Sequence, residues 1–474
     1  MPARLLGIDV GTTFCKAVVV EAGGRVVAEA REPTPWTAVP TGAEIDPEAL
    51  AAAALRAAAG ALAAAPPGRV AGVGVAGMAE TGVLVDPRGR PVAPAIAWHD
   101  RRGAEQAQAA AADLGGEAFA AHTGLRPGPL CSLAKLAWQR QHLPATLRAH
   151  RWLGVPEWVA RRLGADEIAE FSLASRTGLF DLNARAWWPA ALAWLDVPAA
   201  LLPDPAASGT CVGRVGDALP GARGAAIAVA GHDHVVGMIG AGATGDADVL
   251  HSAGTAEAFV RTSPAHLPPA RVREAVAGGV SVGWHVLPDR WALISGGELS
   301  VPLSAVARML GVNGRGARER LDAAADALPS TEPTPRLEAV AGTGELILRG
   351  IGAGTTPAHV WRAAVEATAA LGETAVACSD AIAGPRERIV AVGGGVRGRA
   401  VRAAKERRLG AIDWSPVGEA TARGAGLLAG LAAGAIETWD ELRCAAGAVG
   451  ERSSRKLDTG EAGRKPPAQD VAHV

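Results

Sequence analysis

The chain begins with a strand–turn–strand pattern, and this pattern limits the possible folds more than any other feature of the sequence. Apolar residues at 5–8 and 17–20 flank a polar turn at 9–13, and two glycines then reverse the chain into a further strand over 25–30. An Ala-rich helix that begins at Pro47, with Asp46 as its cap, follows this meander. Strands that come first, with a helix afterwards, predict an α/β sheet domain rather than a regular βαβ array.

A related pattern recurs near the middle of the chain. Strands are expected over 226–229, 248–252 and 258–261. A Gly-Thr dipeptide lies between the last two of these strands, as another lies between the first two strands of the chain. This internal repeat predicts two domains of related architecture. We expect an N-terminal domain over 1–240 and a C-terminal domain over 241–450.

The second half of the chain is also expected to contain several helices. Helices are predicted at 302–310, 316–327, 357–381 and 419–432, with a strand at 389–392. The last segment, 451–474, is polar and contains Gly and Pro-Pro, a composition that predicts a disordered tail.

Composition excludes several classes of protein. With 474 residues and a hydrophobic content of 49%, the chain is long enough for two buried cores. A net charge of −1 without a basic run argues against nucleic acid or a membrane surface as a partner. The five cysteines form no C-x-x-C pair, which favours reduced thiols over disulfides or a zinc site. No signal peptide and no bilayer-length apolar stretch is found, so a cytoplasmic protein is expected.

The first turn has the composition of a phosphate-binding loop. Gly11 lets the backbone approach a ligand closely, and the hydroxyls of Thr12 and Thr13 and the ammonium of Lys16 can meet phosphate oxygens. Asp9, at the end of the strand, is placed to hold Mg²⁺ through water. The alternative is a plain β-hairpin with a polar turn.

Two glycine-containing segments of the second half are further candidates for nucleotide contacts. Gly254-Thr255 is a candidate second phosphate clamp, although Gly-Thr turns are common. The glycines at 393–395 directly follow a predicted strand and leave a wall without side chains, against which a planar base can lie. The alternative for this triplet is a loop that requires unusual backbone dihedrals.

A fourth segment, Gly231-His232-Asp233-His234, supplies a candidate general base. Asp233 follows an apolar strand and is expected on a turn, where its carboxylate can accept a proton from a substrate hydroxyl during phosphoryl transfer. The flanking histidines raise the alternative of a metal site. On an extended segment His232 and His234 would share a face that excludes Asp233, which argues against that site. Either histidine can instead line a substrate pocket or pack.

A fifth set of residues has the chemistry of a sugar-binding site. In Met78-Ala79-Glu80, the glutamate can accept substrate hydroxyls, and Trp98 can stack on the face of a sugar. The alternative for the segment 98–102 is structural. In that case Asp100 caps a helix that begins near residue 102, Trp98 lies in the core, and the two arginines at 101 and 102 face solvent.

Taken together and in order, these residues resemble the FGGY family of carbohydrate kinases, which includes glycerol, xylulose, ribulose and gluconate kinases. The resemblance extends from about residue 5 to about residue 436. The matching segments are GIDVGTTFCKAVVV, AIAWHDRR, LAKLAW, FSLASRTGLFDL, VAGHDHVVGMIGAG, SAGTAE, VAVGGGVRG and GEATARGAGLLAG. Their joint order and spacing make coincidence a poor explanation.

The resemblance implies an α/β fold of two ribonuclease H/actin-like (ASKHA) domains with a cleft between them. It also implies that the protein is an ATP-dependent, Mg²⁺-dependent kinase in carbohydrate metabolism, with Asp233 as the catalytic base and Asp9 supporting the metal. The residues that would then hold the nucleotide and its phosphates are Gly11, Thr12, Thr13, Lys16, Gly254, Thr255, Gly394, Gly395 and Arg397. The residues expected to contact the sugar or polyol are Met78, Ala79, Glu80, Trp98, Glu170, His232 and Asp233.

Three departures from the family pattern bear on the substrate. Ala79 stands where the family often has Arg or His, and Glu170 stands where ketopentose kinases commonly have a shorter aspartate, which would change the depth of the pocket. The segment 341–345 is a poor match to a G-E-R motif of the C-terminal domain. A ketopentose, a polyol and a sugar acid therefore all remain open as substrates.

The competing interpretation is a non-catalytic sensor of the same fold that binds sugar or ATP. The presence of both Asp9 and Asp233 favours the enzyme. A chaperone-like or filament-forming ATPase of the same superfamily is less suitable, because such proteins have no matching G-H-D-H and W-x-D-R segments. The family resemblance suggests a homodimer.

Overall fold

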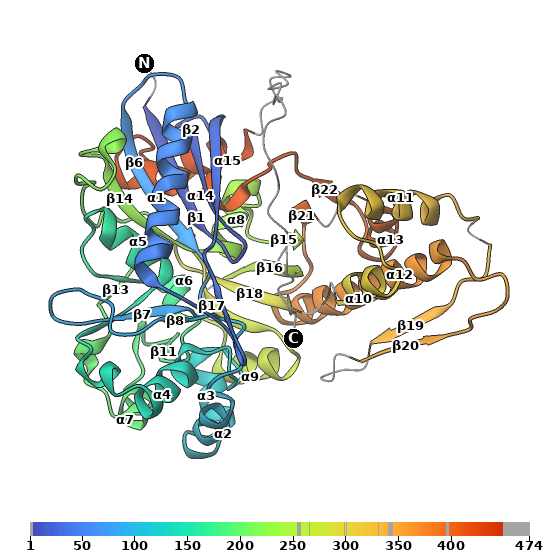
Figure 1. Ribbon diagram of the computed structural model, residues 1–474, viewed down its shortest axis with the longest axis horizontal. Coiled ribbons are helices and arrows are strands. Elements are labelled where there is room, and N and C mark those ends of the chain that lie inside the picture. Colours follow the sequence, from blue (N-terminus) through green and yellow to red (C-terminus); the bar gives the residue numbers. More distant parts are fainter. Residues whose placement is uncertain are drawn as a thin grey trace.

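The computed structural model describes residues 3–253, 257–264, 266–297, 299, 301–329, 331–339, 345–394 and 398–448. Two β-sheets dominate the structure, and each is accompanied by helices (Figure 1). A helical lobe with a protruding two-stranded hairpin extends to one side of the second sheet (Figure 1). Of the helices in the described part of the chain, none is both long and apolar enough to cross a membrane.

The first sheet has five strands in the order β14-β6-β1-β2-β3. β1 pairs antiparallel with β2 and parallel with β6, and β14 pairs parallel with β6. The bounds are Arg4–Val10 for β1, Phe14–Glu21 for β2, Val26–Pro33 for β3, Val70–Gly77 for β6 and Ala226–His232 for β14. The strand–turn–strand opening of the sequence is therefore confirmed.

The second sheet repeats this arrangement with one additional edge strand, in the order β17-β18-β16-β15-β21-β22. β15 pairs antiparallel with β16 and parallel with β21, as β1 does with β2 and β6. The bounds are Asp248–Ala253 for β15, Glu257–Pro264 for β16, Ser281–Trp284 for β17, Arg290–Gly297 for β18, Arg388–Val392 for β21 and Ile412–Trp414 for β22. The two sheets have the strand arrangement of ribonuclease H/actin-like domains, so the repeat in the sequence reflects a repeated fold.

Helix α1 (Pro47–Ala64) covers one face of the first sheet, and it begins as the sequence predicts. The side chain of Asp46 accepts a hydrogen bond from the backbone nitrogen of Glu48, at 3.1 Å, and proline occupies the first turn. The opposite face is covered by α14 (Ala420–Ala432), which approaches very closely. A Cβ atom added to Gly7 would lie 1.7 Å from the carbonyl oxygen of Ala422, so glycine is required at that position.

Helix α8 (Asp233–Ala241) follows β14 and connects the first sheet to the second. It packs against α14 between the two sheets (Figure 1), and a Cβ atom on Gly240 would lie 1.7 Å from the carbonyl oxygen of Ala420. Small residues on both helices thus allow their backbones to come into contact. Because α14 from the second half of the chain covers the first sheet, the division at residues 240 and 241 remains a prediction.

The remaining elements surround these two sheets. Between β6 and β14 lie the helices α2 (Ala104–Asp113), α3 (Gly116–Thr123), α4 (Ser132–His142), α5 (Val155–Leu163), α6 (Phe171–Ala174) and α7 (Pro189–Leu195). The second half contains α9 (Pro269–Ala277), α10 (Val301–Met309), α11 (Arg315–Asp326), α12 (Pro357–Ala383), α13 (Arg399–Leu409) and α15 (Trp439–Gly447). The predicted helices at 302–310, 316–327 and 357–381 are confirmed as α10, α11 and α12.

Short strands complete the fold. They are β4 (Thr37–Val39), β5 (Gly42–Ile45), β7 (Gly82–Val85), β8 (Ala95–Ile96), β9 (Arg151–Gly154), β10 (Ala169–Glu170), β11 (Phe180–Asp181), β12 (Ala186–Trp187), β13 (Pro205–Ala206), β19 (Arg336–Ala339) and β20 (Leu346–Arg349). The last two form the protruding hairpin of Figure 1.

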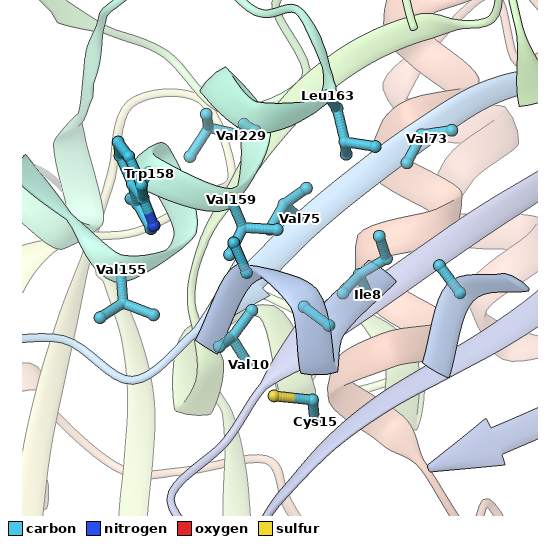
Figure 2. Packing of buried hydrophobic residues seen from close by; sticks show 14 of the residues in the cluster. Ile8, Val10, Cys15, Val73, Val75, Val155, Trp158, Val159, Leu163 and Val229 are labelled. Carbon is cyan, nitrogen blue, oxygen red and sulfur yellow. The ribbon is translucent and has the colours of Figure 1, made fainter. Parts of the chain in front are cut away.

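The largest core lies between the first sheet and the helices α1 and α5. Figure 2 shows Ile8, Val10 and Cys15 from the hairpin β1–β2 in the same core as Trp158 and Val159 of α5, and all five side chains are fully buried. Burial of apolar side chains of this size contributes roughly 1.5–3 kcal/mol each. This packing fixes the position of the ends of β1, β6 and β14 relative to one another.

Candidate active site

The carboxyl ends of three parallel strands meet at one edge of the first sheet. Val10 at the end of β1 lies opposite Gly77 at the end of β6, and His232 at the end of β14 lies opposite Gly77 on its other side. The segments that follow these strands are therefore brought together. They are the turn at 11–13, the segment Met78-Ala79-Glu80 and the start of α8 at Asp233. This edge thus combines residues that the sequence assigned to phosphate, sugar and proton transfer.

The turn between β1 and β2 is held by side chains from neighbouring segments. The indole nitrogen of Trp36 donates to the carbonyl oxygen of Thr12 at 2.6 Å, and that of Trp98 donates to Thr12 Oγ1 at 2.9 Å. Thr34 Oγ1 donates to the carbonyl oxygen of Gly11 at 2.7 Å. The turn is indeed that of a β-hairpin, and these bonds make it a preorganised one.

A cluster of charged side chains lies next to this turn. Lys16 Nζ is 2.9 Å from Glu419 Oε2 and 3.7 Å from Asp9 Oδ2. Burial raises the pKa of Asp9 to about 7; Lys16 opposes this shift, and the charges of Asp233 and Glu419 add to it. Asp9 is therefore a carboxylate whose ionised form needs more positive charge than its surroundings supply.

Glu419 was not identified as a site residue from the sequence. It immediately precedes α14, inside the segment GEATARGAGLLAG that carries part of the family resemblance. Its contact with Lys16 joins the start of α14 to the start of β2. A carboxylate directly before a helix was the available signal, but its partner is about 400 residues away in the sequence.

Asp233 lies at the first position of α8, and not on a turn as the sequence had suggested. Its Oδ1 accepts a hydrogen bond from the backbone nitrogen of His234 at 2.6 Å and lies 3.2 Å from His232 Nε2. About a quarter of the Asp233 side chain is exposed. A carboxylate at a helix N-terminus is stabilised in its ionised form by the helix dipole.

The prediction that His232 and His234 share one face of an extended segment, with Asp233 on the other face, is also wrong. Because the strand ends at His232 and a helix begins at the next residue, His232 contacts Asp233, and the rings of His232 and His234 lie edge to face at 5.5 Å. His232 is buried, and burial lowers its pKa well below the usual value, with the charges of His234 and Arg176 adding to the effect. His232 is therefore a neutral imidazole.

The expected sugar-binding residues are only partly brought together. Glu80 lies at the edge of the sheet, and its Oε1 accepts a hydrogen bond from Arg176 Nε at 2.8 Å. Met78 and Ala79 are almost completely buried in the core of the first sheet, and Ala79 also lines a small cavity next to Glu80. Arg176 was missed from the sequence, although it lies in the matched segment FSLASRTGLFDL.

Glu170 does not set the depth of a pocket, which corrects the sequence-based expectation. Its side chain is completely buried and caps the short helix α6, where Oε2 accepts hydrogen bonds from the backbone nitrogens of Ser172 and Leu173 and from Ser172 Oγ. Ser172 Oγ also accepts from the backbone nitrogen of His232 at 2.9 Å. Glu170 is thus linked to the end of β14 through Ser172, behind the surface at which Asp233 is exposed.

Burial raises the pKa of Glu170 to about 8. The hydrogen bonds from Ser172 and Leu173 oppose this shift, and the nearby Glu157 adds to it. Among the described residues, none donates to Glu170 Oε1. Glu170 is therefore protonated at neutral pH, as expected for a carboxyl group removed from water without a cationic partner.

The segment 98–102 agrees with neither interpretation in full. Trp98 is half-buried, packs on the core and also donates to Thr12 Oγ1, so it is placed beside the β1–β2 turn. The next helix begins at Ala104 rather than near residue 102. Arg102 is largely buried and binds Asp100 and Glu44, so it does not face solvent as the structural alternative assumed.

The residues predicted to contact the nucleotide are described only in part. The predicted contacts Gly254, Thr255, Gly395 and Arg397 lie outside the described residues. Gly394 is exposed, and a Cβ atom there would meet no atom within 4 Å. Gly393, by contrast, has φ of +106°, and a Cβ atom would lie 2.2 Å from the carbonyl oxygen of Ala253, so at this position glycine is required by the backbone.

Comparisons with known proteins agree with this arrangement. Residues 4–240 match the N-terminal domain of the FGGY family of carbohydrate kinases. The chain is 30% identical to the xylulose kinase of Streptomyces coelicolor over 91% of this chain and 89% of that protein. It is 31% identical to the glycerol kinase of Bordetella parapertussis, over 92% and 90% of the two chains.

Solved structures share the fold over almost the whole length. The xylulose kinase of Rhodospirillum rubrum has a TM-score of 0.81 at 25% identity, covering 93% of this chain and 92% of that one. The glycerol kinase of Plasmodium falciparum has a TM-score of 0.83, covering 94% and 92%, and its 17% identity supports the fold alone. The chain therefore belongs to the FGGY family of carbohydrate kinases, enzymes that transfer a phosphoryl group from ATP to a sugar or polyol.

Proposed function

We propose that this kinase uses MgATP to phosphorylate a hydroxyl group of a small neutral polyol or ketose, with Asp233 as the general base. The observation that carries this proposal is the position of Asp233. Its partly exposed carboxylate lies at the same sheet edge as Glu80, which follows the neighbouring strand β6, and as the β1–β2 turn, which follows the next strand along. A base there can reach a hydroxyl group that points toward a phosphate bound at the turn.

The surroundings of Asp233 support its role as a proton acceptor. Both of its close contacts, from His232 and His234, are to Oδ1, so we assign Oδ2 to the substrate hydroxyl. His232, neutral because burial lowers its pKa, lies with Nε2 3.2 Å from Asp233 Oδ1 and so leaves the negative charge of the carboxylate in place. Thr421 Oγ1, in the first turn of α14, donates to the carbonyl oxygen of Asp233 at 3.1 Å and connects the two helix N-termini.

The charged cluster at Asp9 fits a divalent cation. Asp9 is buried, its Oδ1 receives no hydrogen bond from the described residues, and its pKa is raised because ionisation there is poorly compensated. Within the described residues no group of three or more His, Cys, Asp or Glu side chains could hold a metal ion. Mg²⁺ is commonly held by one or two carboxylates together with substrate phosphates. Asp9 would hold the ion, whose charge stabilises the phosphate oxygens during transfer.

Two further groups at the turn would orient the transferred phosphate. Lys16 presents its ammonium group between Asp9 and Glu419, from which it can reach a phosphate oxygen by side-chain rotation. Helices α8 and α14 begin at this edge, and helix N-termini favour negative charge. These groups act on charge that increases on the phosphate during transfer, which is how electrostatic preorganisation lowers a barrier.

The balance of charge favours a neutral substrate over a sugar acid. Near Glu80, Arg176 is paired with Glu80 itself, and Lys135 is buried and donates to the carbonyl oxygens of Trp98, Pro129 and Leu130. A substrate carboxylate would therefore meet the carboxylates of Glu80 and Asp233, while these cations are already engaged. The sequence relatives named as xylulose and glycerol kinases support the same choice.

The test is a comparison of kcat/KM, measured by ADP release from MgATP, for glycerol, xylulose, ribulose and gluconate. We expect turnover with at least one neutral compound and a kcat/KM for gluconate at least about 100-fold lower, because the juxtaposition of like charges costs several kcal/mol. A gluconate value equal to or above that of every neutral compound would contradict the proposal.

A further inference from the structure

The strongest feature not used by the mechanism is the arginine that follows α6. We propose that Arg176 is a specificity-determining positioning residue, which holds Glu80 in the orientation that binds substrate hydroxyls and connects it to the second sheet. This inference rests on the proposed function, because it deepens the assignment of Glu80 to the polyol. Nothing in the sequence pattern marks this pairing, since the two residues are 96 positions apart.

Arg176 makes two directional contacts with different nitrogen atoms. Nε donates to Glu80 Oε1 at 2.8 Å, and Nη1 donates to Ser281 Oγ at 2.8 Å. Both partners of the ion pair are largely buried, with side-chain exposures of 16% for Arg176 and 11% for Glu80. A planar guanidinium can hold two acceptors in fixed directions, whereas the point charge of a lysine cannot.

Glu80 is held in an unusual backbone conformation. Its φ is +63°, in the left-handed region that costs a non-glycine residue about 1 kcal/mol or more. Ser132 Oγ donates to its carbonyl oxygen at 3.0 Å, so both the backbone and the side chain are fixed from outside. With Arg176 on Oε1, the second oxygen Oε2 remains for hydroxyl groups of the substrate. A strained residue with one oxygen fixed and one directed elsewhere is typical of a binding site.

The contact with Ser281 extends this support to the second sheet. Ser281 begins the edge strand β17, and its own hydroxyl also lies 3.2 Å from the carbonyl oxygen of Ile294 in β18. Arg176 therefore connects the segment after β6 in the first sheet to the edge of the second sheet. The geometry at Glu80 consequently depends on the relative position of both halves of the protein.

Four variants of the full-length enzyme test this inference: Arg176→Met, Arg176→Lys, Glu80→Gln and the double variant Arg176→Met with Glu80→Gln. The measurements are kcat and KM for the best neutral substrate, KM for ATP, and the Kd for ADP by calorimetry. We expect Arg176→Met to lower kcat/KM for the polyol at least about 30-fold, mainly through KM, because it leaves a buried carboxylate unpaired. The Kd for ADP should change less than about 3-fold, and lysine should restore only part of the loss.

The double variant distinguishes positioning from independent contacts. If Arg176 acts through Glu80, the double variant should lose much less in kcat/KM than the product of the two single losses. Additive losses, an unchanged KM for the polyol in Arg176→Met, or an equal loss of ADP affinity would overturn the inference. Should Arg176→Met fail to fold, Ser281→Ala removes only the second-sheet contact. It should raise KM for the polyol several-fold, and an unchanged KM would again overturn the inference.

A matched control is available at Arg126. Its Nη2 donates to the carbonyl oxygens of Val276 and Ala277, so it also joins the two halves of the chain, but without contacting Glu80. Arg126→Met should leave KM for the polyol unchanged. If Glu80→Gln has no effect on KM, the assignment of the sugar site fails. If Glu80→Gln raises KM and Arg176→Met does not, only the role of Arg176 fails.

Discussion

Replacement of Glu170 by glutamine should make the stability of the protein less sensitive to rising pH. The carboxyl group is completely buried, and its pKa is raised from 4.5 to about 8, chiefly by burial. Between these two values the unfolded chain releases a proton that the folded chain retains. The stabilising contribution is therefore complete below pH 4.5 and is lost as pH rises toward 8.

The size of this effect follows from the shift. Each pKa unit corresponds to 1.36 kcal/mol, so a change from 4.5 to about 8 amounts to a free energy on the order of 5 kcal/mol. Glutamine imitates the protonated form. Its carbonyl oxygen can accept the hydrogen bonds from Ser172 and Leu173, and its amide takes the place of Oε1.

The assay is urea unfolding of the parent protein and Glu170→Gln at pH 5, 6, 7 and 8. The difference in free energy of unfolding should shift by several kcal/mol in favour of the variant as pH rises from 5 to 8. Glu167→Gln is a suitable control, because Glu167 is half-buried, pairs with Arg151 and Arg161, and lies only three residues away. The reasoning is refuted if the two proteins lose stability in parallel over this range.

Three further substitutions have defined expected outcomes. Arg423→Met removes a buried guanidinium that donates to five backbone carbonyl oxygens. We expect urea unfolding to show a free energy of unfolding that is lower by at least about 4 kcal/mol, and a loss below about 1 kcal/mol would contradict this. Gly231→Ala puts a methyl group 2.6 Å from Ser172 Oγ, at a position where the backbone φ is +122°. Displacement of the following residues His232 and Asp233 should lower kcat at least about 10-fold, and a normal kcat would contradict this. Lys405→Met leaves the buried Glu257 without its cation and should lower the free energy of unfolding by about 3–5 kcal/mol. Adding Glu257→Gln to this variant should recover part of the loss, and no recovery would contradict the importance of the pair.

The parts of the fold that depend on local sequence were predictable. The turn at 9–13, the Asp46 cap and the repeated strand pattern are set by neighbouring residues, through glycine dihedrals, capping hydrogen bonds and alternating apolar positions. The order of the motifs along the chain was sufficient to indicate the family. None of these features requires knowledge of contacts between distant segments.

The contacts that complete the site were not predictable in this way. Arg176 with Glu80, and Lys16 with Glu419, are pairs of residues distant in sequence, and a charged residue alone does not indicate its partner. The wrong expectation for Glu170 has the same origin, since burial of a carboxyl group depends on the packing of the whole domain.

The error at His232 and His234 had a different cause. The period of two that applies to a strand was continued past the point where a helix begins, at Asp233. The nucleotide contacts at 254–255, 395 and 397, the disordered tail at 451–474, the homodimer and the cytoplasmic location remain predictions.

The most direct test of the central claim is the turnover of Asp233→Ala with MgATP and the best neutral substrate, with Asp233→Asn measured beside it. A general base typically contributes 10²–10⁴-fold to a rate, so we expect kcat to fall about 1,000-fold or more in both variants. The Kd for ADP and the free energy of unfolding should remain close to those of the parent. Near-normal turnover in either variant, with folding intact, would contradict the assignment of Asp233 as the base.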